Sequence, residues 1–396
     1  MPPAIKVKTI LLICLVISIG QLSMGLISPA LPWIAKDFAI TSERAQLMVS
    51  LYLLGFGPSQ FIYGPISDAI GRKKVLIAGL LIALFGLLIT IFFQHSFTVM
   101  LIGRLLQGIG AGCCAVLARA SARDRFDNDQ LPVAMSYIAM TTSTTALVAP
   151  ILGGFINYHF GWVVVFISLL GYLCCALVLI VHSVDESMTQ FTPLPSIKNT
   201  LLQYKALLTS GHFLHFASLG WLNFSMIIIT LSIMPFIMQN QIGMNSFDYA
   251  LWALIPALGK LVGAFICNRI SPIIGVKKML CITPLLHFSS AVWFYFCPVV
   301  PLYLMLGQLL MILGVGIAIP CAQALVMRPY KQSAGITAAM YGGGQMIVSA
   351  VISMLLMWIG LNQIWQLSII IMLFAAFSFI NLLSAFHSQQ TFEQQI

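Results

Sequence analysis

The sequence predicts an all-α integral membrane protein with twelve transmembrane helices, arranged as two six-helix bundles related by a parallel pseudo-two-fold repeat. Three observations predict this fold: an apolar composition, twelve long apolar runs, and similar segments that recur at a fixed offset. Of the 396 residues, 60% are hydrophobic and only 7% are charged. Such a chain has too little polar surface to cover a water-soluble globule.

The apolar runs define the individual helices, because a membrane span needs about 20 apolar residues. The twelve runs are 9–34, 45–67, 75–94, 97–118, 132–157, 161–182, 211–239, 246–270, 279–297, 301–326, 335–359 and 364–386. The first run follows Lys6 and Lys8, as a signal peptide would. It is too long for the apolar core of a signal peptide and lacks a small-residue cleavage site, so we assign it as the first helix.

Positive charge is concentrated on one side of the predicted membrane. Lys36 and Arg44 fall on the opposite side, and Arg104 and Lys260 lie within runs. The other 15 of the 19 cations share one side: Lys6, Lys8, Arg72, Lys73, Lys74, Arg119, Arg123, Arg125, Lys198, Lys205, Arg269, Lys277, Lys278, Arg328 and Lys331. Cytoplasmic loops are enriched in Lys and Arg, so we expect both termini in the cytoplasm. The net charge of +9 then reflects topology and predicts no nucleic-acid partner.

A polar stretch over 185–210 interrupts the apolar pattern, and we interpret it as a cytoplasmic linker. It divides the chain into an N-terminal bundle (1–184) and a C-terminal bundle (211–396). At an offset of 204, residues 103–112 share five of ten positions with residues 307–316. Residues 71–74 align with 275–278 at the same offset, which indicates a duplicated six-helix unit. Chance similarity between Gly- and Leu-rich helices is the alternative.

The nine cysteines all fall in or at the edge of apolar runs, without metal-ligand spacing. We therefore expect no metal, no disulfide framework and no cofactor. The chain also lacks a constellation of nucleophile, metal ligands or phosphate-binding loop, so we do not expect an enzyme.

The segment 64–76 forms the turn between the second and third runs. Gly64 allows a close helix approach, and Gly71 allows a sharp reversal. The cations at 72–74 hold the turn at the cytoplasmic face, and Asp68 can meet a cation or a helix N-terminus. An ordinary basic loop would explain the three cations but not this spacing.

This turn resembles the loop between helices 2 and 3 of the major facilitator superfamily of transporters. The resemblance implies the fold of that family, with a substrate site near the midplane between the two bundles. It also implies a conformational switch made of Gly64, Asp68, Gly71, Arg72 and Arg119. In this switch Asp68 would act as a latch that meets Arg119 and the N-terminus of the run 335–359.

Two further segments resemble motifs of this family. Gly103-Arg104-Leu-Leu-Gln107-Gly108-Ile-Gly110 is similar to R-x-x-Q-G-x-G, which implies that Arg104 is buried against the first helix and takes part in proton coupling with Gln107. Ala149-Pro150-Ile-Leu-Gly153-Gly154 is similar to the antiporter motif G-P-x-x-G-G, with Ala149 in place of the first glycine, and implies export. The alternative is that Pro150, Gly153 and Gly154 only allow tight helix packing.

Within the superfamily, the chain is most similar to drug:proton antiporters of the Bcr/CflA/EmrD-like branch. The similarity rests on segments 52–68, 118–124 and 342–345. However, no acid lies within a predicted span, whereas Arg104 and Lys260 do. Ionisable residues inside a membrane usually face a cavity or a partner, so these cations are candidate coupling or substrate residues. A structural lysine bonded to backbone carbonyls is the alternative for Lys260.

Polar residues from the helices that line the central cavity in this family complete the candidate site. They are Gln21, Thr142, Asn223, Gln308, Tyr341 and Gln345. Some of these could instead join helices to one another.

Three functional hypotheses follow. The first is a proton-coupled antiporter that exports small amphipathic compounds or drugs across the bacterial inner membrane by alternating access. The second is a carrier for an anionic metabolite or carboxylate siderophore, suggested by Arg104 and Lys260 without interior acids. The third is a non-transporting sensor on the same fold. The expected partners are a small-molecule substrate, protons and the lipid bilayer, and we expect a monomer.

Overall fold

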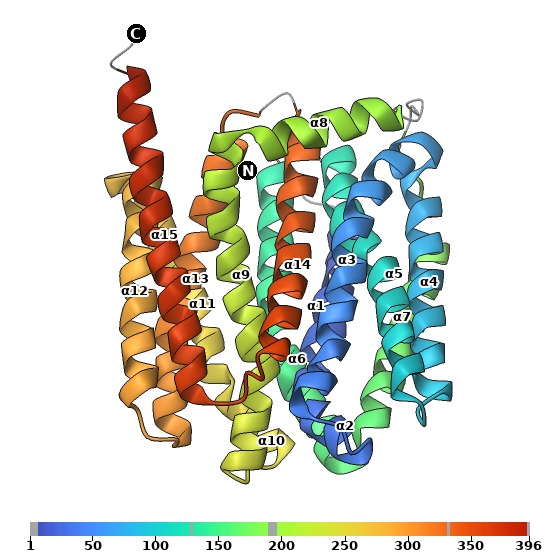
Figure 1. The fold of residues 1–396 in the computed structure, drawn as a ribbon. Coiled ribbons are helices and arrows are strands. Elements are labelled where there is room, and N and C mark those ends of the chain that lie inside the picture. The colour runs from blue at the N-terminus through green and yellow to red at the C-terminus, as the bar shows by residue number, and fades with distance from the viewer. Residues whose placement is uncertain (1–6, 127–129, 189–195, 331–332, 394–396) are drawn as a thin grey trace.

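The computed structural model describes residues 7–126, 130–188, 196–330 and 333–393, and the regular structure of these residues is helical (Figure 1). Lys6 and Lys331, which entered the charge analysis, lie outside the described residues. The first half consists of α1 (Val7–Gly25), η1 (Ser28–Ala30), α2 (Leu31–Asp37), α3 (Ser42–Ile70), α4 (Arg72–Phe92), α5 (Phe97–Arg125), α6 (Leu131–Phe160) and α7 (Trp162–Ser183). After α8 (Ile197–Thr209), the second half consists of α9 (Gly211–Phe236), η2 (Ile237–Gln241), α10 (Ser246–Trp252), α11 (Leu254–Ile274), α12 (Val276–Phe296), α13 (Pro301–Met327), α14 (Ala334–Trp358) and α15 (Ile364–Glu393).

Eleven helical segments among the described residues are long and apolar enough to cross a membrane. They match eleven of the twelve predicted runs. The run 45–67 corresponds to α3, which has 29 residues but is not among the eleven. Polar residues account for this difference, since Gln46, Ser50, Ser59 and Gln60 of α3 are buried inside the protein. Twelve spans therefore stay a prediction.

The helices lie side by side, with α3, α9 and α14 near the middle of the view (Figure 1). α3 packs against α5 within the first half and against α14 of the second half. In the second half, α13 packs against α9, α11 and α12, and α12 packs against α15. The central helices therefore join the two halves.

Prolines interrupt the first span. α1 ends at Gly25, Pro29 lies in η1, and Pro32 lies in the first turn of α2. Proline has no backbone N–H to donate, so it is well suited to the first turn of a helix, where Pro29 and Pro32 lie. The span as a whole covers Val7–Asp37.

The turn after α3 reverses at Gly71, whose φ is 107°. This backbone conformation favours glycine, because a Cβ would collide with the following peptide. Gly275 occupies the corresponding place between α11 and α12 with φ 90°. The two glycines are separated by the offset of 204 that also relates the sequence segments.

The linker contains a helix that the polar pattern did not predict. α8 lies across one end of the bundle, where the turn at Gly71 also lies (Figure 1). We call this end the basic end, because Arg72, Lys73 and Arg125 lie there. The helix covers part of the boundary between the halves, because it contacts α9 and α14 of the second half and its Tyr204 ring lies against Phe61 of α3 in the first half.

Candidate functional site

A cavity of about 110 Å³ lies between the two halves. α6 of the first half lines it with Ser143 and Pro150. The second half contributes Thr230 of α9, Lys260 of α11 and Gln308 of α13, among mostly aliphatic neighbours. A concave, largely apolar site with a few polar groups at a domain boundary is typical of small-molecule binding.

Lys260 is the cation of this cavity. The side chain is partly exposed and makes no hydrogen bond or ion pair with any residue that the structure describes. The lining contains no Asp or Glu side chain. A charged amine in such surroundings raises the free energy of the protein unless water or a ligand solvates the charge or the amine loses its proton. Lys260 is therefore available to a substrate or to proton exchange.

Arg104 occupies a different place, inside the first half. Its side chain is fully buried, and its Nε donates to Met48 O of α3 at 3.0 Å. Its Nη1 donates to Ser23 O of α1 at 3.3 Å and to Gln107 Oε1 at 2.5 Å. The guanidinium also lies 4.5 Å from the centre of the Tyr52 ring. Arg104 does not line the cavity, so the structure does not bring it together with Lys260.

Of the six polar residues predicted to line the central cavity, only one lines the cavity described above. Gln308 lines the cavity between the halves. Asn223 and Tyr341 are buried within the second half, where Asn223 Nδ2 donates to Leu219 O at 2.8 Å. The other three, none of which lines this cavity, are Gln21, Thr142 and Gln345.

The predicted antiporter motif lies on α6 where this helix contacts the end of α1 in its own half and α10 in the second half. A Cβ on Gly153 would come within 2.0 Å of Leu26 O, in the break between α1 and η1. A Cβ on Gly154 would come within 2.5 Å of Ser246 O in α10, and Ser246 Oγ donates to Gly154 O at 3.2 Å. Gly154 thus allows direct backbone contact between the halves, beside the Pro150 that lines the cavity.

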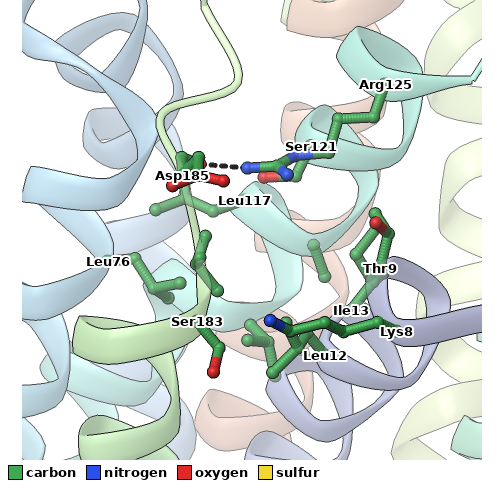
Figure 2. A pocket seen from close by; sticks show the side chains of 13 residues that line it. Lys8, Thr9, Leu12, Ile13, Leu76, Leu117, Ser121, Arg125, Ser183 and Asp185 are labelled. Carbon is green, nitrogen blue, oxygen red and sulfur yellow. Dashed lines mark hydrogen bonds between the residues drawn. The ribbon is translucent and has the colours of Figure 1, made fainter. Parts of the chain in front are cut away.

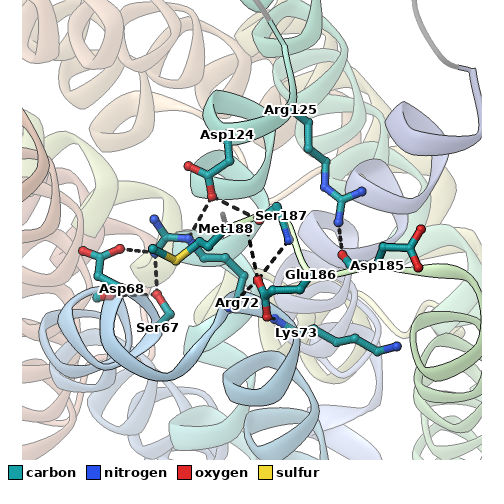
Figure 3. A network of polar contacts seen from close by, with 11 residues as sticks. Ser67, Asp68, Arg72, Lys73, Asp124, Arg125, Asp185, Glu186, Ser187 and Met188 are labelled. Atoms are coloured by element: carbon teal, nitrogen blue, oxygen red, sulfur yellow. Dashed lines mark hydrogen bonds and ion pairs between the residues drawn. The ribbon is translucent and has the colours of Figure 1, made fainter. Parts of the chain in front are cut away.

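At the basic end, a polar network surrounds Arg72 (Figure 3). Its Nη1 lies 2.5 Å from Asp68 Oδ1 and also donates to Ser67 Oγ at 2.5 Å. Its Nε pairs with Asp124 Oδ2 at 3.0 Å. The Arg72 side chain therefore joins the end of α3 to the end of α5.

The start of the linker joins this network through Glu186. Its carboxylate accepts hydrogen bonds from Arg72 N at 2.9 Å and from Lys73 N at 3.1 Å, so it caps the N-terminus of α4. Figure 3 shows Glu186 beside Arg72 and Lys73. A carboxylate at this position also meets the positive end of the helix dipole. Sequence reasoning missed this role, although an acid that directly follows the sixth apolar run could have indicated it.

Replacing Glu186 by Ala should weaken the attachment of the linker. Loss of a helix N-cap costs about 1 kcal/mol, so we expect faster proteolysis between 185 and 196 and a lower unfolding temperature. Asp185→Ala is the matched control, because Arg125 donates to the backbone oxygen of Asp185 and not to its carboxylate. Equal proteolysis of the two variants and the parent would contradict this role.

Asp68 also faces a hollow of about 500 Å³ between the halves at the basic end. Gly64 lines the hollow on the α3 side, and Gly335, near the start of α14, lines it opposite. The predicted partner Arg119 is exposed, and among the described residues no hydrogen bond or ion pair joins it to Asp68. The structure thus places Asp68 near the start of α14 but not in contact with Arg119.

Other contacts join the halves outside the lining of the cavity that contains Lys260, beginning with the crossing of α3 and α14. A Cβ on Gly57 of α3 would come within 2.9 Å of Gly343 O in α14. Beyond this crossing, the Tyr204 ring of α8 lies 5.2 Å from the Phe61 ring of α3, and Tyr204 Oη donates to Phe61 O at 3.5 Å. Burial raises the pKa of Tyr204, which keeps its phenol a neutral donor.

A further set of contacts joins the halves around η1. Ser28 Oγ donates to Leu231 O at 2.7 Å, and Gln239 Nε2 donates to Pro29 O at 2.9 Å. Together with the Ser246 contact described above, they join η1 and α6 to the second half. The α3–α14 crossing and the contacts of η1 and α6 are thus two separate sets of contacts between the halves.

Comparison with known proteins identifies similar chains. A family model described as Major Facilitator Superfamily matches residues 13–237, which is more than half of the chain. The chain is 27% identical over 355 residues to Multidrug resistance protein D of Escherichia coli (strain K12), covering 88% of each chain. It is 29% identical over 292 residues to the Bicyclomycin resistance protein homolog of Haemophilus influenzae, covering 70% of this chain and 71% of the relative. Among solved structures, a D-xylose-proton symporter matches with a TM-score of 0.75 and 15% identity, covering 94% of this chain and 97% of that chain.

Proposed function

Because the chain belongs to the major facilitator superfamily, we propose that it is a proton-coupled antiporter that exports small amphipathic compounds across the bacterial inner membrane. The observation that carries this proposal is the cavity between the halves, which are joined by separate sets of contacts at the α3–α14 crossing and around η1. The names of the relatives, which refer to multidrug and bicyclomycin resistance, support export of drugs.

The proposal includes twelve spans in two related bundles, with α3 as the twelfth span. α3 has 29 residues, which exceeds the length that a span needs. The helix bounds support the repeat, since α4 covers Arg72–Phe92 and α12 covers Val276–Phe296, each bound shifted by 204.

In the proposed cycle, the two halves rock about the cavity. The α3–α14 crossing and the contact of α8 with α3 hold the basic end closed, while the η1 and α6 contacts hold the other end closed. Lys260 serves as the coupling group, because a proton on its amine and a cationic drug in the same cavity repel each other. Mutually exclusive occupancy by a proton and a substrate is what antiport requires.

A carrier for anions is the second candidate function. It is favoured by one observation: the cavity holds a cation and its lining holds no acid. A carboxylate or phosphate on the substrate would then supply the missing counter-charge.

Topology provides a separate prediction. Cysteines introduced at Asn199 on α8 and at Asn128, which lies outside the described residues, should react with an impermeant thiol reagent only from the cytoplasm. A cysteine at Ser42, at the start of α3, should react only from outside. The parent chain, with its nine cysteines, supplies the background. Reversed labelling would contradict the inferred orientation.

Export itself can be tested in cells that lack their own drug exporters. Expression of the chain should raise the tolerated concentration of bicyclomycin or of a lipophilic cation and lower its accumulation, and a protonophore should remove both effects. Unchanged accumulation of every compound tested, with the protein present in the membrane, would contradict drug export.

A further inference from the structure

A second cavity, of about 220 Å³, lies within the first half at the basic end (Figure 2). We call it the α1–α5 pocket, because residues of these two helices form most of its wall: Lys8, Thr9, Leu12, Ile13, Val16, Leu117, Ala118, Ser121 and Arg125. Leu76 of α4 and residues 183–185 after α7 complete the wall. None of these residues lines the cavity between the halves.

The wall changes from charged to apolar along both helices. Lys8 lies in the first turn of α1 and Arg125 in the last turn of α5, so both lie at the end of the bundle. Val16 and Leu117 lie eight residues further in along each helix. At the helical rise per residue, this separation is about 12 Å. The pocket is therefore a slot whose mouth carries two cations and the carboxylate of Asp185, with an aliphatic floor.

No ion pair within the described residues joins either cation to an acid, although Asp185 lines the same pocket. Lys8 makes no hydrogen bond or ion pair with any described residue. Arg125 donates to the backbone oxygen of Asp185, while the Asp185 side chain is exposed. Figure 2 shows the Lys8 and Arg125 side chains extending toward the segment that contains Ser183 and Asp185. An anion at the mouth could therefore pair with both cations.

We propose that the α1–α5 pocket binds a single-chain anionic amphiphile, namely a fatty carboxylate or an alkyl phosphate. The headgroup lies between Lys8 and Arg125, and the alkyl chain lies against Leu12, Val16 and Leu117. A simple inorganic anion would leave the aliphatic floor uncovered, and a two-chain phospholipid exceeds the volume of the slot. Enrichment of cations at the cytoplasmic face would account for Lys8 and Arg125 but not for the apolar cavity behind them.

Photolabelling can test this proposal without measuring transport, so its outcome is independent of the drug-export proposal. The probe is dodecanoate with a diazirine at the end of its chain, added to the full-length protein in nanodiscs of a zwitterionic lipid. We expect label on the peptides that contain residues 12–16 and 117–118. Unlabelled dodecanoate and dodecyl phosphate should compete, whereas acetate, inorganic phosphate and dodecyltrimethylammonium should not.

Two variants separate the headgroup from the chain. Lys8→Gln should weaken probe binding about tenfold, as expected for loss of one charge-assisted hydrogen bond. Ser121→Trp should remove the label by filling the pocket. Lys36→Gln is the matched control, because Lys36 lies on α2, outside this pocket. Label that both pocket variants retain, or equal competition by the cationic amphiphile, would overturn the proposal. If inorganic phosphate competes as strongly as dodecyl phosphate, the pocket binds anions without recognising an alkyl chain, and this result would also overturn the proposal.

Discussion

Asp68→Asn is expected to abolish transport while expression and substrate affinity stay within about threefold of the parent. The substitution removes the ion pair between Asp68 and Arg72, whose closest atoms lie 2.5 Å apart. The Asp68 side chain is 43% exposed, so loss of the pair should cost about 1 kcal/mol of stability or less. The expected effect is therefore on the balance between conformations, because Asp68 faces the hollow between the halves and does not line the substrate cavity.

The matched control is Lys74→Gln in the same turn. Lys74 is exposed and makes no hydrogen bond or ion pair with any described residue, so its replacement should leave transport nearly unchanged. Both variants are compared by drug uptake into vesicles and by equilibrium binding to purified protein. Normal uptake by the Asp68→Asn variant would exclude the latch role.

Lys260→Ala is expected to separate anionic from cationic substrates. A carboxylate-bearing ligand should lose about 2 to 3 kcal/mol of binding free energy, the value of a charged hydrogen bond. A lipophilic cation should bind equally well or better, because the substitution removes a repelling charge from a low-dielectric cavity. Lys260→Arg should keep the charge but restore only part of the anion binding, since a planar guanidinium does not replace a compact ammonium.

Binding is measured with purified protein by calorimetry, with proton release followed at the same time. Gln308→Ala is the matched control, because Gln308 lines the same cavity without a charge. If the parent and Lys260→Ala bind every anion with equal affinity, the anion-carrier hypothesis is wrong. If they also release equal numbers of protons on binding a cation, Lys260 is not the coupling group.

Much of the fold could be predicted from the sequence because hydropathy determines which segments can span a membrane. Eleven of the twelve predicted runs match helices that are long and apolar enough to cross one. The run 45–67 differs because α3, which packs against α5 and α14, buries polar residues inside the protein. These residues lower the mean hydropathy of the helix, so hydropathy alone does not identify it as a span. α8 escaped prediction because a short amphipathic helix over polar sequence has no long apolar run.

The site was harder to predict, because apolar helices do not reveal which face each residue occupies. Lys260 and Gln308 line the cavity between the halves, but Arg104 is held by backbone carbonyls of α1 and α3 and points elsewhere. The reversal at Gly71 was easier to predict, because it depends on a local sequence, whereas the role of the turn as a switch stays a prediction. Glu186, by contrast, is 114 residues from Arg72 and is brought to it only by folding.

Coupling to protons is the central claim, and transport into proteoliposomes under an imposed pH gradient tests it most directly. With an acidic interior, the parent protein should concentrate bicyclomycin or a lipophilic cation inside the vesicles as protons leave. A protonophore should abolish this accumulation, and Asp68→Asn should lack it. Accumulation that requires an alkaline interior, or equilibration that does not depend on the gradient, would contradict proton-coupled antiport.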